Sequence, residues 1–205
     1  MRATYPLRRA QIDEYIAALT KAIGRPRTPV LEDELKKFCR DDNLAEMILF
    51  VAASIGMGKL KVRVCCDAPS GETSKLSWPS PVPVFGTREF KNLILTLSVS
   101  RSDDLFFLRG LFISPSERMI CWSARSMAKL LLCSILHPLG NTHEAQDLAA
   151  MILGYREVYL RYAQTGRRQA KVETQQSLEE DLKLSGISLT AEDVVYAHTM
   201  IDCIR

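Results

Sequence analysis

The sequence predicts an α+β domain, rich in helices, with a small and mainly antiparallel sheet packed on a long central helix. Two short stretches, 59–64 and 93–99, alternate apolar and polar residues in the manner of half-buried strands. A strong helix start at Ser114-Pro115 opens an apolar-periodic segment that lasts until Pro138. Helical patterns before and after these elements complete the prediction.

The N-terminal part, residues 1–57, is expected to be helical. Apolar residues recur at helical spacing up to Gly24, and Thr28-Pro29 then has the form of a second helix start. A third helix, which Asp42 can cap, has a broad apolar face and is expected to end at Gly56. The apolar faces of the first and third helices are Ile12, Ile16, Leu19 and Ile23, and Leu44, Met47, Ile48, Val51 and Ile55.

The first strand is predicted to have one apolar face and one basic face that is exposed to solvent. The apolar face holds Leu60, Val62 and Val64, and the basic face holds Lys59, Lys61 and Arg63. The segment 67–87 is rich in proline and is expected to be a long loop. The second strand is expected to pair antiparallel with at least one neighbour. Its apolar side chains should pack on the helix that begins at Pro115, and they are Leu93, Leu95, Leu97 and Val99.

The long helix is expected to end near Leu136, and Thr142 should cap the next helix, which continues to Gly166. The core-facing stripe of that helix is Leu148, Met151, Ile152, Tyr155, Tyr159 and Tyr162. We therefore predict a single α+β domain over residues 1–164, with a helical part (1–57) followed by the sheet and core helices (58–164). Residues 165–205 are predicted to form a linker and a C-terminal helical appendage, whose last helix is capped by Thr190 with Asp193.

Charge and composition narrow the class of partner. The 205 residues carry 27 Lys and Arg against 24 Asp and Glu, a net charge of +3 that is too small to indicate nucleic-acid binding. Uncharged apolar runs such as Leu130 to Ile135 are far shorter than the ~18 residues that a membrane span needs, so no membrane partner is expected. Six scattered cysteines and no signal-peptide pattern favour reduced thiols in a cytoplasmic protein, with the redox role of Cys65 and Cys66 left open.

Three segments together resemble the ImmA/IrrE family of zinc metallopeptidase-like proteins, over roughly residues 44 to 160. They are Val84-Phe85-Gly86-Thr87-Arg88-Glu89-Phe90 before the second strand, His137-Pro138-Leu139 after the long helix, and Glu144-Ala145-Gln146-Asp147-Leu148-Ala149-Ala150 with its continuation to Tyr155. The resemblance implies a zincin-like core, in which a sheet packs on an active-site helix and a second helix supplies a further metal ligand. It also implies a bacterial setting beside regulators and mobile elements.

The family's metal motif, H-E-x-x-H, is changed at each chemical position in this chain. The matching segment is Ala124-Arg125-Ser126-Met127-Ala128-Lys129, where Arg125 and Lys129 stand at the histidine positions and Ser126 at the glutamate position. A guanidinium cannot ligate zinc, and an ammonium beside it repels the ion, so no cofactor is expected. With Glu144 and Asp147 on the next helix, these residues form a degenerate former metal site. We expect Arg125 or Lys129 to lie within salt-bridge distance of one of the two acids, although a solvated helix face is an equally simple interpretation.

The leading functional hypothesis is a catalytically inactive metallopeptidase-like protein. It would act by binding a protein partner as a regulator or accessory factor, for example of a bacterial mobile element or defence system. One alternative is a hydrolase with a rearranged site, either a metal site at His137, His143 and Glu144 or a serine nucleophile at Ser126 with Lys129. Another is a nucleic-acid-associated module that uses a basic surface at Lys59, Lys61, Arg63, Arg167 and Arg168. Neither the identity of the partner nor the oligomeric state follows from the sequence.

Overall fold

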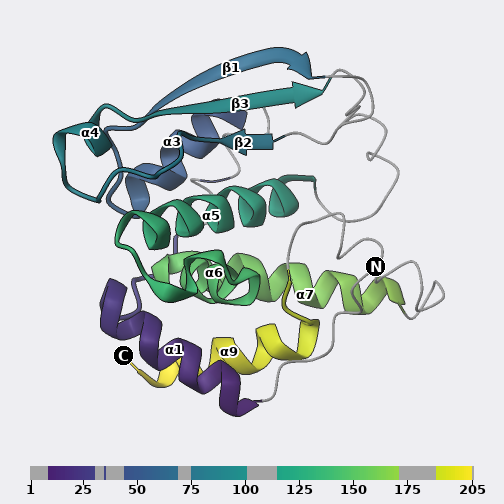
Figure 1. The fold of residues 1–205 in the computed structure, drawn as a ribbon. Helices are drawn as coiled ribbons and strands as arrows, with labels where there is room; N and C mark the ends of the chain where they lie inside the picture. The colour runs from purple at the N-terminus through teal and green to yellow at the C-terminus, as the bar shows by residue number, and fades with distance from the viewer. Residues whose placement is uncertain are drawn as a thin grey trace.

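A computed structural model describes residues 9–30, 35, 44–68, 75–100, 115–170 and 188–204, and within them the α+β class is confirmed (Figure 1). The helices are α1 (Arg9–Ile23), α3 (Leu44–Ser54), α4 (Arg88–Lys91), α5 (Pro115–Ser134), α6 (His143–Ala150), α7 (Arg156–Ala170) and α9 (Ala191–Cys203). The strands are β1 (Lys61–Ala68), β2 (Lys75–Ser77) and β3 (Ile94–Ser100). A 3₁₀ turn, η2 (Pro138–Asn141), precedes α6, and a π-helical segment, η3 (Met151–Tyr155), follows it.

The sheet is mixed and has the strand order β1-β3-β2. β2 pairs antiparallel with β3, as expected for the second predicted strand, with Leu76 opposite Leu97. β1, however, runs parallel to β3, with Val62 opposite Leu95, so the expectation of a mainly antiparallel sheet is wrong. The physical reason is the connection from 69 to 93, which is long enough to return the chain to the end of the sheet where β1 begins.

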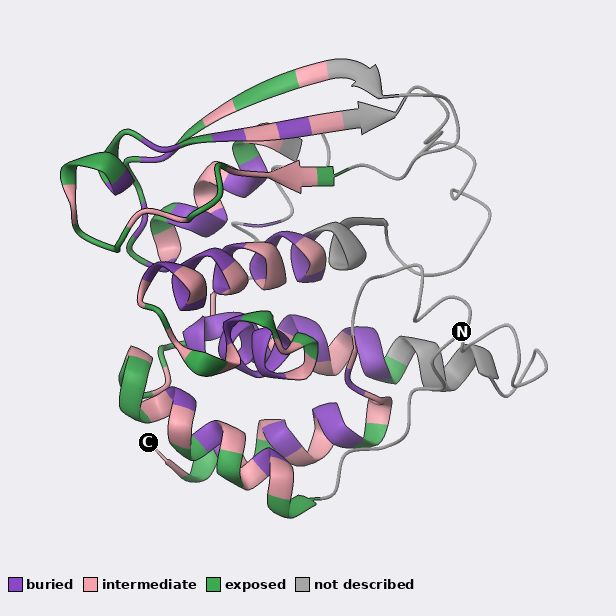
Figure 2. Ribbon diagram, viewed as in Figure 1, coloured by how far each residue is buried: buried purple, intermediate pink, exposed green. Residues whose placement is uncertain are grey.

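Burial follows the predicted alternation in β3 but not throughout β1 (Figure 2). Leu93, Leu95 and Leu97 are buried, whereas Ile94 between them is 41% exposed. The register places Val64 on the same face as Leu97, yet Val64 is 48% exposed, which corrects the prediction of a buried apolar face. Among the described strands, β1 lies at the edge of the sheet, so its side chains have a strand neighbour on one side only.

The elements form successive layers (Figure 1). The sheet lies over α3 and α5, α6 and α7 lie beneath α5, and α1 and α9 close the opposite side. One buried cluster runs through all of these layers. The whole predicted stripe of the helix after Thr142 belongs to it, since each of Leu148, Met151, Ile152, Tyr155, Tyr159 and Tyr162 is at most 3% exposed.

The long helix α5 begins at Pro115 as predicted and ends at Ser134, just before Leu136 adopts a positive φ of 56°. The predicted helix from Thr142 to Gly166 is instead broken at Gly154, where φ is 114°. A Cβ at that position would lie 2.9 Å from the Thr28 carbonyl oxygen, and the backbone N–H of Val30 donates to the Gly154 carbonyl at 3.0 Å. Gly154 therefore lets the extended segment 26–30 dock on the kink. Most of the short helix expected after Pro29 lies outside the described residues.

The last helix belongs to the core. The capping box that the sequence predicts is present, because the Asp193 N–H donates to Thr190 Oγ1 and the Thr190 N–H donates to the Asp193 carboxylate, each at 3.2 Å. Val194, Ala197 and Ile201 of α9 are buried in the main cluster, against α1 and α7. Part of the predicted appendage is thus packed into the domain, while 171–187 lie outside the described residues. No helix in the described ranges is long and apolar enough to cross a membrane.

Candidate functional site

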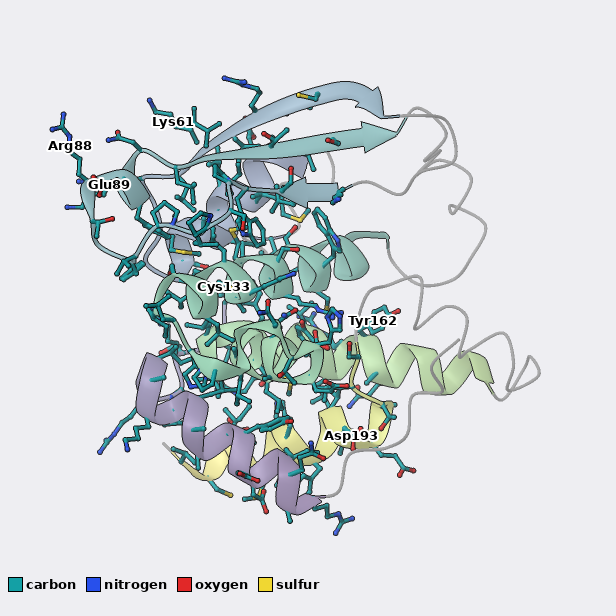
Figure 3. The ribbon with its side chains drawn as sticks, viewed as in Figure 1. Lys61, Arg88, Glu89, Cys133, Tyr162 and Asp193 are labelled. Atoms are coloured by element: carbon teal, nitrogen blue, oxygen red, sulfur yellow. The ribbon has the colours of Figure 1, made fainter. Side chains whose placement is uncertain are left out.

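One side of α5 is partly exposed, in contrast to the buried residues around it. Ala124, Met127, Ala128 and Leu130 are at most 2% exposed and face the core. The partly exposed residues recur at helical spacing and include the segment that matches the metal motif. We call them the α5 face: Trp122, Arg125, Ser126, Lys129 and Cys133. Figure 3 shows Cys133 on α5, in the layer between the sheet and α6.

The Arg125 side chain reaches from α5 to α6 and to the residues before α9. Its Nε lies 3.8 Å from Asp147 Oδ1 and donates to Gln146 Oε1 at 3.4 Å. Its Nη2 donates to Ser188 Oγ at 3.1 Å and lies 2.5 Å from His143 Nδ1. The expected proximity of a basic residue on this helix to an acid on the next is therefore confirmed for Arg125 and Asp147.

Asp147 is completely buried and connects α5, α6 and α7 with the segment before α9. Its Oδ1 accepts a hydrogen bond from the Tyr159 hydroxyl of α7 at 2.9 Å, and its Oδ2 accepts one from the Ser188 N–H at 2.7 Å. Burial raises the pKa of Asp147 to about 6, against the lowering effects of the Arg125 charge and of these hydrogen bonds. The carboxylate is thus a structural junction that water does not reach.

Two neighbours of this junction, Tyr159 and His143, also have shifted pKa values. Burial, followed by the Asp147 charge, raises the pKa of Tyr159 well above its usual range, so its hydroxyl remains a donor. Burial and then the Arg125 charge lower the pKa of His143. Because a guanidinium only donates, the neutral His143 ring accepts from Arg125 through Nδ1.

Lys129 takes a different direction from Arg125. Its Nζ lies 5.9 Å from the centroid of the Trp78 ring, and Trp78 directly follows β2. Within the described part of the chain, no carboxylate lies within ion-pair distance of Lys129. The Lys129 charge lowers the pKa of Cys133, but burial raises it by more, so Cys133 is a thiol and not a reactive thiolate.

The structure does not bring together the metal ligands expected at His137, His143 and Glu144. His137 Nδ1 accepts a hydrogen bond from the Leu139 N–H at 3.2 Å and so caps η2, while His143 faces Arg125. Among the described residues, no group of three His, Cys, Asp or Glu side chains is arranged to hold a metal ion. The role of His137 in this turn is therefore to cap η2.

The basic surface is placed only in part. Lys59, Lys61 and Arg63 are exposed, and Lys61 points away from the helices (Figure 3). The side chains of Arg167 and Arg168, at the end of α7, lie outside the described part, as does that of Cys66. Among the described residues, Cys65, Cys133 and Cys203 carry free thiols.

Sequence reasoning missed three contributors to the site: Tyr159, Gln146 and Ser188. Tyr159 was predicted as a core residue, but its hydroxyl also holds Asp147. Gln146 is 1% exposed and links Arg125 to the Gly140 carbonyl, to which its Nε2 donates at 2.8 Å. The one signal in the sequence was that Tyr159 follows Asp147 by twelve residues within a helical pattern. That spacing does not by itself indicate a hydrogen bond between the two side chains.

Comparison of the chain with protein-family models, with curated proteins and with solved structures gives no match.

Proposed function

We propose that the chain is a catalytically inactive, zincin-like protein that acts in the cytoplasm by binding a protein partner, as a regulator or accessory factor. The observation that carries the proposal is the position of the α5 face. It lies beside the end of β2, an edge strand among the described strands, and next to α6, and it holds Arg125, Ser126 and Lys129 where a zincin would hold its metal ligands.

The chemistry of these side chains supports binding rather than hydrolysis. Arg125 remains charged and is already held by four neighbours, so it is neither a base nor a metal ligand. Asp147 is buried and hydrogen-bonded, so it cannot reach a substrate water. No hydrogen bond among the described residues joins Ser126 to a general base, as a serine nucleophile requires.

A partner in extended conformation fits the free edge of the sheet. Among the described strands, β2 pairs with β3 on one side only, and an edge strand offers its unpaired backbone groups to an added strand. Because Trp78, directly after β2, lies against Lys129 of α5, a peptide added at this edge would lie near the α5 face. The basic side chains of β1 support nucleic-acid binding less well than the β2 edge supports peptide binding. Charged side chains on an edge strand such as β1 also have a simpler role, which is to prevent unwanted pairing with other strands.

The test is selection of a displayed random-peptide library on the full-length chain, followed by backbone N-methylation of a selected peptide. Strand addition uses the peptide N–H groups of alternate residues, so methylation at every second position should abolish binding while the intervening positions tolerate it. Selection of no peptide, or equal tolerance at all positions, would contradict the proposed mode of binding.

A peptidase assay separates this proposal from the enzyme alternative. Purified protein loaded with Zn²⁺ is expected to leave casein and fluorogenic peptides intact. Cleavage that is lost in Arg125→Met or Ser126→Ala would instead place catalysis on the α5 face.

A further inference from the structure

We propose that the partner is an acidic segment, and that the carboxylate of one of its Asp or Glu side chains binds Lys129 beside Trp78. The inference rests on the proposed function, because it assigns the chemistry of a peptide bound at the β2 edge.

The first argument is the state of the Lys129 ammonium. It is partly buried, lies 5.9 Å from the centre of the Trp78 ring, and has no carboxylate within ion-pair distance among the described residues. The aromatic face holds the cation in place but accepts none of its three N–H groups in a conventional hydrogen bond. A partly desolvated cation with unused donors gains most from an incoming anion.

The second argument is the sign of the charge around Lys129. The charges of Arg125 and Lys129 both lower the pKa of His143, and the effect of Lys129 is the smaller of the two. Glu144 acts in the opposite direction on His143 but makes no ion pair with Lys129. Asp147 is turned inward and fully buried, with Arg125 between it and the surface. Among the described residues of the α5 face, the Arg125 charge is thus matched by a carboxylate and the Lys129 charge is not, so an anion that approaches this face is attracted to Lys129.

The third argument selects a carboxylate over a phosphate group. A dianionic phosphate is best held by several charged donors, and the Arg125 guanidinium, which could supply two of them, is already bound to Asp147, Gln146, His143 and Ser188. One ammonium remains, with the partly exposed Ser126 hydroxyl one helical turn away. This donor set matches a singly charged carboxylate.

The fourth argument is the direction of the peptide side chains. A strand added at the β2 edge alternates its side chains between the two faces of the sheet, so every second one points toward the helix layer. Because Trp78 directly follows β2 and lies beside Lys129, one of these side chains is placed at the ammonium. The partner thus requires an acidic residue at one position and tolerates substitution on the opposite side.

The experiment compares peptide-library selections on four full-length proteins: the wild type, Lys129→Met, Lys129→Glu and Lys61→Met. Lys61 is an exposed lysine on the outer face of the sheet and serves as the matched control. Wild type and Lys61→Met should enrich Asp or Glu at one fixed position. Lys129→Met should lose that preference, and Lys129→Glu should replace it with Lys or Arg. Affinity of a selected acidic peptide should fall about fivefold to tenfold in Lys129→Met.

The outcomes separate the two proposals. Peptides that bind by strand addition but carry no preferred acidic position, or that keep it in Lys129→Met, overturn the inference and leave the proposed function standing. Failure to enrich any peptide on wild type overturns the proposed function and the inference with it. Thermal unfolding of each variant at the wild-type midpoint confirms that a change in selection reports binding rather than folding.

Discussion

Replacing Asp147 with asparagine should change how the stability of the protein depends on pH. The carboxyl group has a pKa of about 6 in the folded protein against an ordinary value of 3.8, because it is completely buried. The folded state therefore binds a proton that the unfolded state releases, and this stabilisation is present below pH 3.8 and lost as the pH rises through 6.

The size of the effect follows from the shift. A difference of about two pKa units corresponds to roughly 3 kcal/mol over the whole titration, of which roughly 2 kcal/mol is lost between about pH 4.5 and 7.5. The amide of the Asp147→Asn variant would keep an acceptor for the Ser188 N–H and would not titrate. Relative to wild type, Asp147→Asn should thus become more stable by about 2 kcal/mol as the pH rises from about 4.5 to 7.5.

The measurement is urea unfolding of both proteins, followed by circular dichroism at several pH values in this range. The difference between the two free energies of unfolding is the decisive quantity. The lowered pKa of His143 makes stability fall toward acid in both proteins, so that contribution cancels. Glu144→Gln, which replaces a partly exposed carboxylate on the same helix, is the control and should follow the wild type. Parallel pH profiles for wild type and Asp147→Asn would refute the assignment of burial as the dominant influence.

Three further substitutions test the fold around the site by chemical denaturation. Gly154→Ala should lower the free energy of unfolding by about 3 kcal/mol, because φ is 114° and the new Cβ meets a carbonyl oxygen. Gly86→Ala is the control: φ is 85° but the space around the new Cβ is open, so the loss should be about 1 kcal/mol. Thr190→Ala should lose about 1 kcal/mol, and Thr142→Ala, whose side chain makes no capping bond, almost nothing. Arg125→Met should lose about 2 kcal/mol at about pH 7.5 and less at about pH 4.5, where the buried carboxyl is protonated. Equal losses within either matched pair, or a pH-independent loss for Arg125→Met, would contradict the respective argument.

The sequence correctly predicted those elements that depend on interactions between residues close together in the chain. The alternation at 93–99 identified a strand with Leu95 buried, and the box at Thr190 identified the start of α9, because period and capping act within a few residues. The parallel direction of β1 and the exposure of Val64 could not be read in this way. Both depend on where the chain returns after a long connection, which is a property of the whole sheet.

The kink at Gly154 shows the same limit in a helix. A glycine inside an amphipathic pattern is compatible with a continuous helix, and the stripe on both sides of it is buried as the pattern predicts. What decides the break is the carbonyl of Thr28, which occupies the place of a Cβ. That contact joins residues far apart in the sequence, so no local pattern contains it.

Arg125 and Lys129 of α5 show how much of an interpretation can rest on a sequence motif. Their spacing of four predicted a common role, as substitutes for two metal ligands, but the structure separates them. Arg125 is bound to Asp147, which lies deeper than the partly exposed Glu144, whereas Lys129 faces Trp78 at the edge of the sheet. Burial separates the two residues: a cation that neutralises a buried carboxylate is needed by the fold, whereas Lys129 has no counter-ion among the described residues. In the binding mode that we propose, the same helix face would stabilise the domain through Arg125 and recognise an acidic peptide through Lys129.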